Sequence, residues 1–545
     1  MTSVEFVLIS WSFWAVVLAS SLTAVVIYGF RPIHRLKLRH LPGPPRPWLF
    51  GNIPETLKEG GIYRTQQIYA QKYGPLFVTH QIFQPIVMVE SPDLARKVLL
   101  GNNYRCVFPN LLFGEEARFE ASTYLDTRSD KHRTVRGAWQ PFFFSGSLEG
   151  FLSLMWDAAD LLADSVEMHC KDDNYMDIHA MVQAMTVQVV GTTAFGVDFH
   201  TQLADKANQY NSDDVKQLLQ AVYDIMAPEA FSFSMYAAFL VLFPSAAPLI
   251  KLVAHCFPDK GLLTVRRGRQ VVIDIVKKLM ADRRADIEHE QKREAKGLSS
   301  RLRASFAEAT GERRGVAPGS FVDLLVNATD KATGESLSDL ERTNQAFVMV
   351  MSAYETTANS LAFTLYMLAR PENKSKVERL TAEVDAFGRN RVPTFEDLDQ
   401  FPWLEACLSE GMRVYPPVPT LTREAERDME LGGYRIEKGT MLGVAVYSMH
   451  NSSAYWKEPE KYLPERFMEG TPESAAKPAH GYLPFGDGVR ACIGLRFARM
   501  EAKLTLIRLF QRFTFELQPG QENLPLRETI TLSAANGVFV KAIPR

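Results

Sequence analysis

The chain has 545 residues, of which 46% are hydrophobic, so it can bury a sizeable core in several domains or in one unusually large one. Its formal net charge of −2 argues against a nucleic-acid partner. The 5 cysteines are scattered and lack Cys-x-x-Cys spacing, which argues against a disulfide framework or a zinc site and favours a reducing compartment.

The first 30 residues predict a membrane anchor. Residues 6–30 carry no charge, and a stretch of about 25 apolar residues can cross a bilayer with some tilt. Basic residues between Arg31 and Arg39 follow, and the positive-inside rule then places the rest of the chain on the cytosolic side. A cleaved signal peptide is the alternative, but it usually has a shorter apolar core and a basic start. This chain has Glu5 and no early Lys or Arg.

A stiff segment, Leu41-Pro-Gly-Pro-Pro45, separates this anchor from the rest of the chain and cannot be helical. No internal repeat is visible, and the composition does not change after residue 50. The sequence therefore does not indicate a second folding unit. We therefore predict an anchor at residues 1–30, a basic and Pro-rich hinge at 31–48, and one large, mainly helical domain at 49–545.

The segment from Thr79 to Glu90 is rich in Ile, Val and Phe, which predicts a hairpin of short strands. Most of the chain after residue 90 is typical of helices separated by polar loops. Residues 266–296 predict a long charged helix, and residues 299–318 predict a polar surface loop.

His132 and Arg136 lie four positions apart, and so on one face of a predicted helix. A pair of this kind is by itself most often a solvated helix face.

Residues 343–369 form the most apolar helical stretch after the anchor, and they include Ser352-Ala-Tyr-Glu-Thr-Thr357. An acid beside hydroxyls in so apolar a helix is informative, because an unpaired buried carboxylate is costly. Such groups are usually functional or paired, which makes Glu355 and Thr356 candidate catalytic residues. The alternative places Glu355 on a polar stripe with Ser352 and Asn359.

Glu410 and Arg413 are spaced to pair on one helical turn. The same spacing recurs elsewhere in the chain and proves little alone. Here, however, the helix ends at Tyr415-Pro-Pro, and Pro464-Glu-Arg-Phe467 follows downstream.

The stretch from Phe485 to Gly494 (FGDGVRACIG) is a glycine-punctuated loop that a strong helical pattern follows. Cys492 should therefore lie close to a helix N-terminus, where amide groups and the helix dipole favour thiolate. The glycines allow positive φ and close backbone approach, and Arg490 adds a nearby cation. A buried structural cysteine is the alternative interpretation.

The helix after this loop should be amphipathic. Its apolar side recurs at helical spacing in Phe497, Met500, Leu504, Ile507 and Phe510. Its basic residues can face outward, namely Arg496, Arg499, Lys503 and Arg512.

These motifs resemble the cytochrome P450 family in order and spacing over nearly the whole chain. The string Phe-x-x-Gly-x-Arg-x-Cys-x-Gly is similar to the family's haem-ligating loop, and residues 352–356 look like its oxygen-binding groove, with Ala353 in place of the usual Gly. The anchor, basic flank and Pro-rich hinge resemble those of microsomal members. The resemblance implies a mainly α fold, a large single helical domain with small β-sheets, preceded by one N-terminal transmembrane helix.

The resemblance also implies roles for the candidate residues. It implies haem b with the Cys492 thiolate as axial ligand to iron, and Thr356 and Glu355 as the catalytic groups that hold and deliver protons. Glu410, Arg413 and Arg466 would form a structural ion network that supports the thiolate loop. The implied haem-binding residues are His132, Arg136, Arg423, Phe485, Arg490 and Cys492. His450 falls in a region that more often reads His-Arg-Asp, and its role is open.

The implied reaction is hydroxylation or epoxidation of a hydrophobic small molecule with O2. No flavin or dinucleotide segment is evident, so electrons from NADPH should arrive through a separate cytochrome P450 reductase at the endoplasmic reticulum membrane. A basic patch could dock it, formed from Lys131, Arg133, Arg136, Arg496 and Arg499. By analogy the substrate pocket would be lined by residues 106–119, Ala353, Val418, Thr420 and the turn at 534–536, which suits a lipid, terpenoid, steroid or polyketide.

Three other interpretations stay open. A haem-thiolate isomerase or dehydratase would keep the fold and need no NADPH, although such members commonly lose the alcohol that Thr356 provides. A haem sensor or electron carrier would need neither a proton relay nor an apolar pocket. An anchored scaffold without haem would make the whole motif series a coincidence.

Overall fold

The computed structural model describes residues 38–45, 51–81, 84–101, 129–170, 174–199, 201–202, 220–221, 235–236, 239, 246–294, 319–328 and 336–545. The predicted anchor, most of the hinge and the predicted polar loop at 299–318 lie outside these residues, as does the predicted pocket segment 106–119. In the part of the chain that is described, no helix is both long and apolar enough to cross a membrane.

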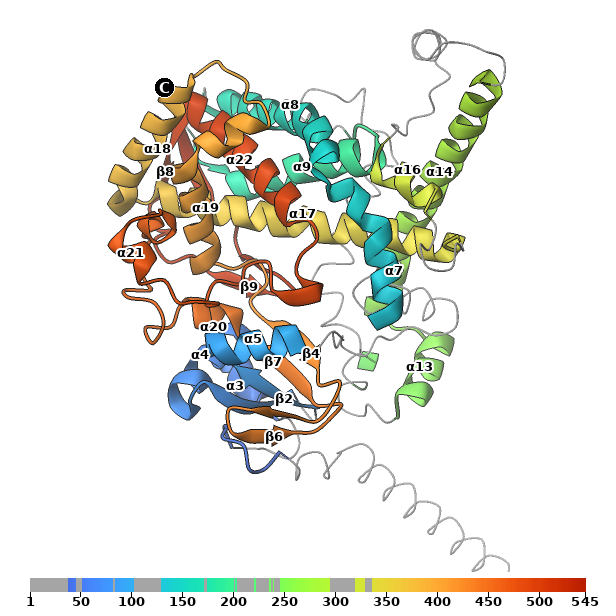
Figure 1. Cartoon of the computed structure of the whole chain (residues 1–545), viewed down its shortest axis with the longest axis vertical. Coiled ribbons are helices and arrows are strands. Elements are labelled where there is room, and N and C mark those ends of the chain that lie inside the picture. Colours follow the sequence, from blue (N-terminus) through green and yellow to red (C-terminus); the bar gives the residue numbers. More distant parts are fainter. Residues whose placement is uncertain are drawn as a thin grey trace, which may run out of the picture.

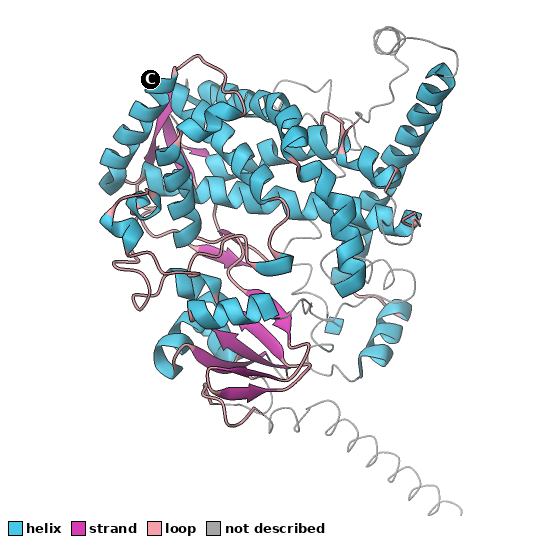
Figure 2. Ribbon diagram, in the orientation of Figure 1, coloured by secondary structure: helices cyan, strands magenta, loops and turns pink. Residues whose placement is uncertain are grey.

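Helices make up most of the described chain (Figure 2). The α-helices are α3 (Ile53–Lys58), α4 (Ile62–Tyr73), α5 (Pro92–Gly101), α7 (Ser129–Trp139), α8 (Ser145–Cys170), α9 (Ile178–Val190), α13 (Ala247–Cys256), α14 (Lys260–Glu294), α16 (Phe321–Val326), α17 (Asp339–Ala369), α18 (Lys374–Phe387), α19 (Pro402–Val414), α20 (Val446–His450), α21 (Pro472–Ala475) and α22 (Leu495–Arg512). Shorter helical turns are η2 (Gln140–Phe143), η3 (Gly191–Phe195), η5 (Pro371–Asn373), η6 (Glu396–Gln400), η7 (Pro464–Phe467) and η8 (Gly488–Arg490).

The strands form four small sheets. They are β1 (Leu76–Gln81), β2 (Gln84–Val89), β3 (Met176–Asp177), β4 (Leu421–Glu424), β5 (Met429–Leu431), β6 (Tyr434–Ile436), β7 (Met441–Val444), β8 (Phe513–Leu517), β9 (Leu526–Glu528), β10 (Leu532–Ala534) and β11 (Phe539–Pro544). The sheet orders are β1-β2-β7-β4, β3-β11-β8, β10-β9 and β5-β6. The expected mainly helical domain with small sheets is therefore confirmed.

The predicted hairpin near the start of the domain is present as β1 and β2, which pair antiparallel. β7 then pairs parallel to β2 and antiparallel to β4, so the strand that carries Arg423 joins this sheet. The sheet lies with α3, α4, α5 and α20 at one end of the molecule (Figure 1).

Helix α17 runs through the middle of the helical part (Figure 1). A capping box starts it, in which the Ser338 hydroxyl accepts the Glu341 amide and the Glu341 carboxylate accepts the Ser338 amide. Its 31 residues extend about 46 Å, and it packs against α9, α19 and α22. Because other elements surround it, it is buried on all sides over most of its length.

Helix α22 begins three residues after Cys492, as predicted, and all five apolar residues of its predicted face are buried. The prediction for its basic side is only partly right. Arg496 is exposed, but Lys503 is buried with its Nζ 3.6 Å from Glu405 of α19. Four helices contact α22, namely α8, α17, α18 and α19. They cover more of its surface than the one apolar face that the amphipathic pattern predicts.

Candidate active site

The loop before α22, residues 483–494, is called here the thiol loop. Gly486 and Gly488 have φ of 69° and 74°, a region that favours glycine, as the sequence predicts. A Cβ on Gly488 would lie 2.7 Å from the carbonyl oxygen of Leu99 at the end of α5, so the loop packs closely there. The Cys492 amide donates to the Phe485 carbonyl at 2.9 Å, which closes the loop beneath the thiol.

The Cys492 thiol is surrounded by protein and still accessible. Cys492 is exposed, yet burial raises the pKa of its thiol, an effect opposed by the Gly494 amide and the charge of Arg136. Protein atoms therefore surround the thiol while part of the surface of Cys492 stays accessible. The sequence predicted that Arg490 and the amides at the helix start would favour thiolate. The Gly494 amide at the start of α22 does act in that direction, but the cation that lowers the pKa of the thiol is Arg136 and not Arg490, and burial outweighs both effects.

Three arginines surround His132 of α7. Burial, followed by the charges of Arg490, Arg136 and Arg423, lowers the pKa of His132 to about 4. Arg136 also donates from Nη1 to the Ala491 carbonyl at 3.0 Å, which ties α7 to the thiol loop. These groups come from α7, η8 and β4, so folding gathers four of the six residues that the resemblance implies as haem-binding.

Phe485, the remaining proposed haem contact, is partly buried at the start of the loop. The guanidinium of Arg499 lies 5.6 Å from the centre of its ring, a cation–π distance. Arg499 also pairs with Glu405 at 3.3 Å.

One short stretch of helix α17, residues 351–356, is not fully buried, and it is called here the open stretch. Between Arg342 and Ala369 every residue is buried except five, which are Met351, Ser352, Ala353, Tyr354 and Thr356. The Thr356 hydroxyl donates to the Ser352 carbonyl at 3.1 Å, and Ser352 is exposed. The helix continues through Ala353, the residue that departs from the family pattern.

Glu355 lies on another side of the same helix. It is buried, and burial raises the pKa of its carboxyl, an effect opposed by a hydrogen bond with Thr531 and by the charge of Arg527. Within the described residues its Oε2 atom has no hydrogen-bond partner. Sequence reasoning missed Thr531 and Arg527, because no local spacing links the C-terminal β9–β10 hairpin to α17.

The polar stripe considered for Glu355 does not continue to Asn359. The Asn359 Oδ1 atom lies 2.8 Å from Nε2 of His179 on α9. Ser352 is exposed on the open stretch, so the three polar residues have three different environments.

Glu410, Arg413 and Arg466 meet in the core. Arg413 donates from Nε and Nη2 to the two carboxylate oxygens of Glu410 at 2.8 and 2.9 Å, and Arg466 Nε reaches Glu410 at 3.3 Å. Both arginines also donate to backbone carbonyls between His450 and Lys461. The ion pairs thus fasten the segment after α20 to α19.

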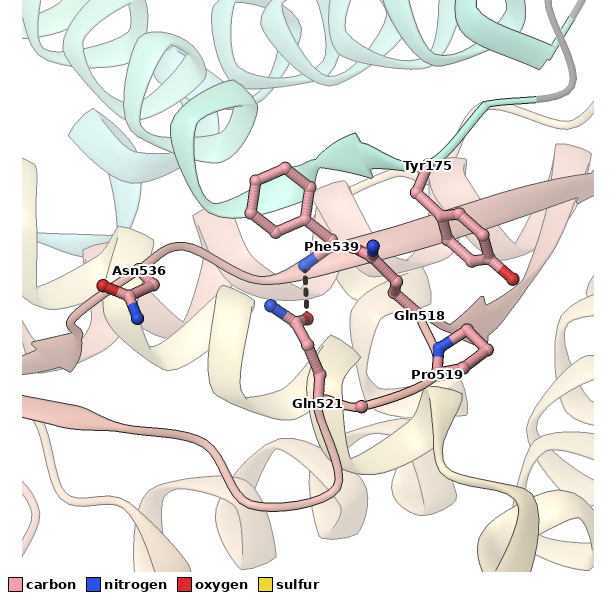
Figure 3. A pocket seen from close by; sticks show the side chains of 7 residues that line it. Tyr175, Gln518, Pro519, Gln521, Asn536 and Phe539 are labelled. Carbon is pink, nitrogen blue, oxygen red and sulfur yellow. Dashed lines mark hydrogen bonds between the residues drawn. The ribbon is translucent and has the colours of Figure 1, made fainter.

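The outer depression drawn in Figure 3 is separate from these groups. It measures about 500 Å³ and is lined by Tyr175, Gln518, Pro519, Gly520, Gln521, Asn536 and Phe539. It lies beside β8 and β11, and β8 follows the far end of α22, about 27 Å along the helix from the thiol loop. Of the turn predicted to line the substrate pocket, Ala534 is buried and Asn536 lines this depression instead.

The sequence model described as Cytochrome P450 matches residues 41–539. The chain belongs to the cytochrome P450 family. Similar proteins include Cytochrome P450 3A11 of Mus musculus, 28% identical with 97% of this chain and 96% of the relative aligned. Thromboxane-A synthase of Sus scrofa is 29% identical at the same coverage, and Cytochrome P450 3A5 of Homo sapiens is 27% identical over 94% of this chain and 92% of the relative.

As a cytochrome P450, the chain is a monooxygenase-type oxidoreductase that uses haem with thiolate-bound iron and electrons from a redox partner. This excludes the scaffold without haem and argues against the non-enzymatic carrier. The accessible internal thiol and the three arginines gathered near it fit a planar iron cofactor with two carboxylates.

Proposed function

We propose that this cytochrome P450 hydroxylates or epoxidises a hydrophobic small molecule, using O2 and NADPH electrons delivered by a separate reductase. The observation that carries the proposal is the pairing of an accessible thiol inside the protein with a cluster of arginines beside it. Arg136 belongs to both, since its charge acts on Cys492 and on His132.

In this proposal the Cys492 thiolate would hold the haem iron, and haem bound to a thiolate would supply reductive activation of O2. Arg136, Arg423 and Arg490 would hold the two haem carboxylates, because guanidinium groups suit bidentate pairing with carboxylate. His132 stays neutral beside them, since its lowered pKa prevents it from adding a fourth positive charge.

Thr356 and Glu355 on α17 would hold and deliver protons for the reaction. The Thr356 hydroxyl gives its hydrogen to the Ser352 carbonyl, which leaves its oxygen able to accept a hydrogen bond from water or substrate on the open stretch of α17. The raised pKa of Glu355 makes its carboxyl a proton reservoir nearer to neutrality than an exposed glutamate. The Glu410–Arg413–Arg466 network is structural.

The reductase would dock beside the thiol loop. Arg133 on α7 and Arg496 on α22 are exposed, and so are the apolar side chains of Leu100 on α5 and Val489 in the loop. Such a surface suits an acidic partner with a small apolar contact. Charge reversal at Lys131 and Arg133 should reduce the salt dependence of electron transfer from the reductase. An unchanged salt dependence would show that the reductase does not dock at these residues.

We further propose that residues 1–30 anchor the protein in the endoplasmic reticulum membrane by a single pass, that residues 31–48 form the hinge, and that the domain at 49–545 faces the cytosol. An apolar substrate dissolved in that membrane, such as a lipid, terpenoid, steroid or polyketide, fits this placement.

A second candidate is a rearrangement that consumes no NADPH. One relative carries the name thromboxane-A synthase, a synthase by name rather than a monooxygenase. Thr356 on the open stretch of α17 favours the monooxygenase. Substrate-dependent NADPH consumption with a reductase distinguishes the two.

The decisive test is the visible spectrum of the dithionite-reduced protein under carbon monoxide. A strongly red-shifted Soret band is expected, and it should disappear in Cys492→Ala. Cys256→Ala is the matched control, because that cysteine is also exposed but lies on α13. A band typical of histidine-ligated haem in the unsubstituted protein would overturn the assignment of Cys492.

A further inference from the structure

His450 ends α20 and is completely buried. Its Nε2 atom accepts the backbone amide of Leu483 at 2.9 Å. Leu483 is the first residue of the thiol loop and is itself buried. The imidazole therefore holds the point at which the chain enters the loop.

Two backbone hydrogen bonds link Leu483 to the backbone of Cys492. The Gly486 amide donates to the Leu483 carbonyl at 3.1 Å, and the Cys492 amide donates to the Phe485 carbonyl at 2.9 Å. Gly486 follows Phe485 directly, so the two bonds share one turn of the loop. A shift of Leu483 away from His450 would thus move Phe485 and Gly486, the turn to which the Cys492 amide is hydrogen-bonded.

The imidazole is itself held on several sides. It stacks on Tyr482, with ring centres 5.6 Å apart and planes at 22°, and meets the edge of Trp456 at 6.4 Å. The backbone carbonyl of His450 accepts Nη1 of Arg413 at 2.8 Å, which joins this residue to the Glu410 ion network. His450 consequently connects that network to the thiol loop.

The ring can act only as a neutral acceptor here. Burial, and then the charge of Arg413, lowers the pKa of His450 to about 3. Because Nε2 accepts the Leu483 amide, the ring proton is on Nδ1, which is buried and makes no hydrogen bond within the described residues, although the nearby backbone of Met412 and Arg413 at the end of α19 acts to raise the pKa.

We propose that His450 is a positioning residue whose Nε2 acceptor fixes the thiol loop and thereby the place of the Cys492 sulfur. The inference rests on the proposed function, in which Cys492 binds iron. It gives a role to a side chain that sequence reasoning left without one. It requires a hydrogen-bond acceptor at this position and not only an aromatic ring.

Two substitutions separate the acceptor from the packing. His450→Phe keeps a ring against Tyr482 but has no acceptor, whereas His450→Gln can place an amide oxygen where Nε2 lies. Tyr482→Phe is the control, because it removes the hydrogen bond to the Ser409 carbonyl of α19 and leaves the Leu483 amide bond intact.

The first readout is hydrogen exchange of the Leu483 amide, which needs no turnover. We expect exchange about tenfold faster in His450→Phe, near the unsubstituted rate in His450→Gln, and unchanged in Tyr482→Phe. Fast exchange at Leu483 in the unsubstituted protein would overturn the proposal without any variant, which covers the case in which His450→Phe does not fold.

The second readout is the fraction of the carbon monoxide complex that keeps the red-shifted Soret band during mild warming. His450→Phe should lose this band earlier than the unsubstituted protein, and His450→Gln should restore it. Equal loss in His450→Phe and Tyr482→Phe would show that only general packing matters and would overturn the positioning role. If the unsubstituted protein never shows the red-shifted band, the proposed function fails, while the exchange measurement still tests the His450 bond.

Discussion

Helices α19 and α22 pack against each other, and each buries a glutamate, but the two carboxyl groups have opposite surroundings. Glu410 of α19 is bonded by Arg413, Arg466 and the Leu463 amide. Neither carboxyl oxygen of Glu501 on α22 has a hydrogen-bond partner in the described chain, and burial raises its pKa well above the ordinary value. Burial alone therefore does not say whether a carboxyl stabilises the fold.

Two further glutamates lie between these extremes. Glu528 accepts the backbone amides of Ile62 and Tyr63 at the start of α4, and burial still raises its pKa to about 7. Glu355 has the Thr531 hydroxyl for a partner, with Oε2 unbonded among the described residues. The four groups form a series, from cationic partners through amides and one hydroxyl to none, and substitutions along it test the comparison.

The largest effect is expected for Glu410→Gln. Removing this charge leaves the buried guanidinium groups of Arg413 and Arg466 without their carboxylate, which should lower the free energy of unfolding by about 3–5 kcal/mol. Urea denaturation measures the change. Glu405→Gln on the same helix is the control: the side chains of Glu405 and its partner Arg499 are partly exposed, the buried Lys503 lies 3.6 Å away, and about 0–1 kcal/mol is expected. Similar losses for both would contradict the comparison.

Glu528→Gln should change how stability depends on pH. The folded pKa is raised from 4.5 to about 7, so the stability that protonated Glu528 contributes is complete below about pH 4.5 and is lost as the pH rises through 7. Glutamine can still accept the Tyr63 amide and does not ionise.

Thermal unfolding of Glu528→Gln should therefore lack this decline, and at pH 8 the variant should be more stable than the unsubstituted protein by up to about 3 kcal/mol. Parallel pH profiles for the two proteins would show that Glu528 titrates as it does in the unfolded chain.

Glu355→Gln should affect turnover more than stability. The amide keeps the shape but cannot deliver a proton, so product formation should fall about 100-fold while peroxide accumulates. Glu355→Asp keeps the acid and should recover part of the rate. Coupled turnover at the unsubstituted rate in Glu355→Gln would remove this residue from proton delivery.

The smallest change is expected at Glu501, and it is opposite in sign to that of Glu410→Gln. Glu501→Leu replaces an unbonded buried polar group by an apolar one and should stabilise the protein by about 1–3 kcal/mol near pH 7. Glu501→Gln should remove only the loss of stability that ionisation causes as the pH rises. Destabilisation by Glu501→Leu in urea denaturation would mean that the carboxyl has a partner.

Local chemistry made several parts of the site predictable. The positive φ of Gly486 and Gly488, the start of α22 after Cys492 and the Glu410–Arg413 turn all depend on neighbours within a few residues. Lys503 was misjudged for the opposite reason, since its partner Glu405 comes from α19. A periodic pattern gives the face of a helix but not how many sides its neighbours cover.

The proposed roles of Thr356 and Glu355 show the same limit. Their adjacency in an apolar helix marked them as unusual, but only folding puts Thr356 on an open stretch and Glu355 against the C-terminal hairpin. His450 had no interpretable signal, because its acceptor acts on Leu483 from another part of the chain.

By itself the sequence determined the family, the position of the thiol loop and the elements that flank it, because glycine conformation, helix capping and apolar periodicity act over short distances. The tertiary structure decided which buried charges have partners. Glu528 meets Tyr63 across 465 positions and Glu410 meets Arg466 across 56, and such encounters depend on packing that no local pattern specifies. The same packing gathers Arg136, Arg423 and Arg490 around His132 and places Arg136 near the Cys492 thiol.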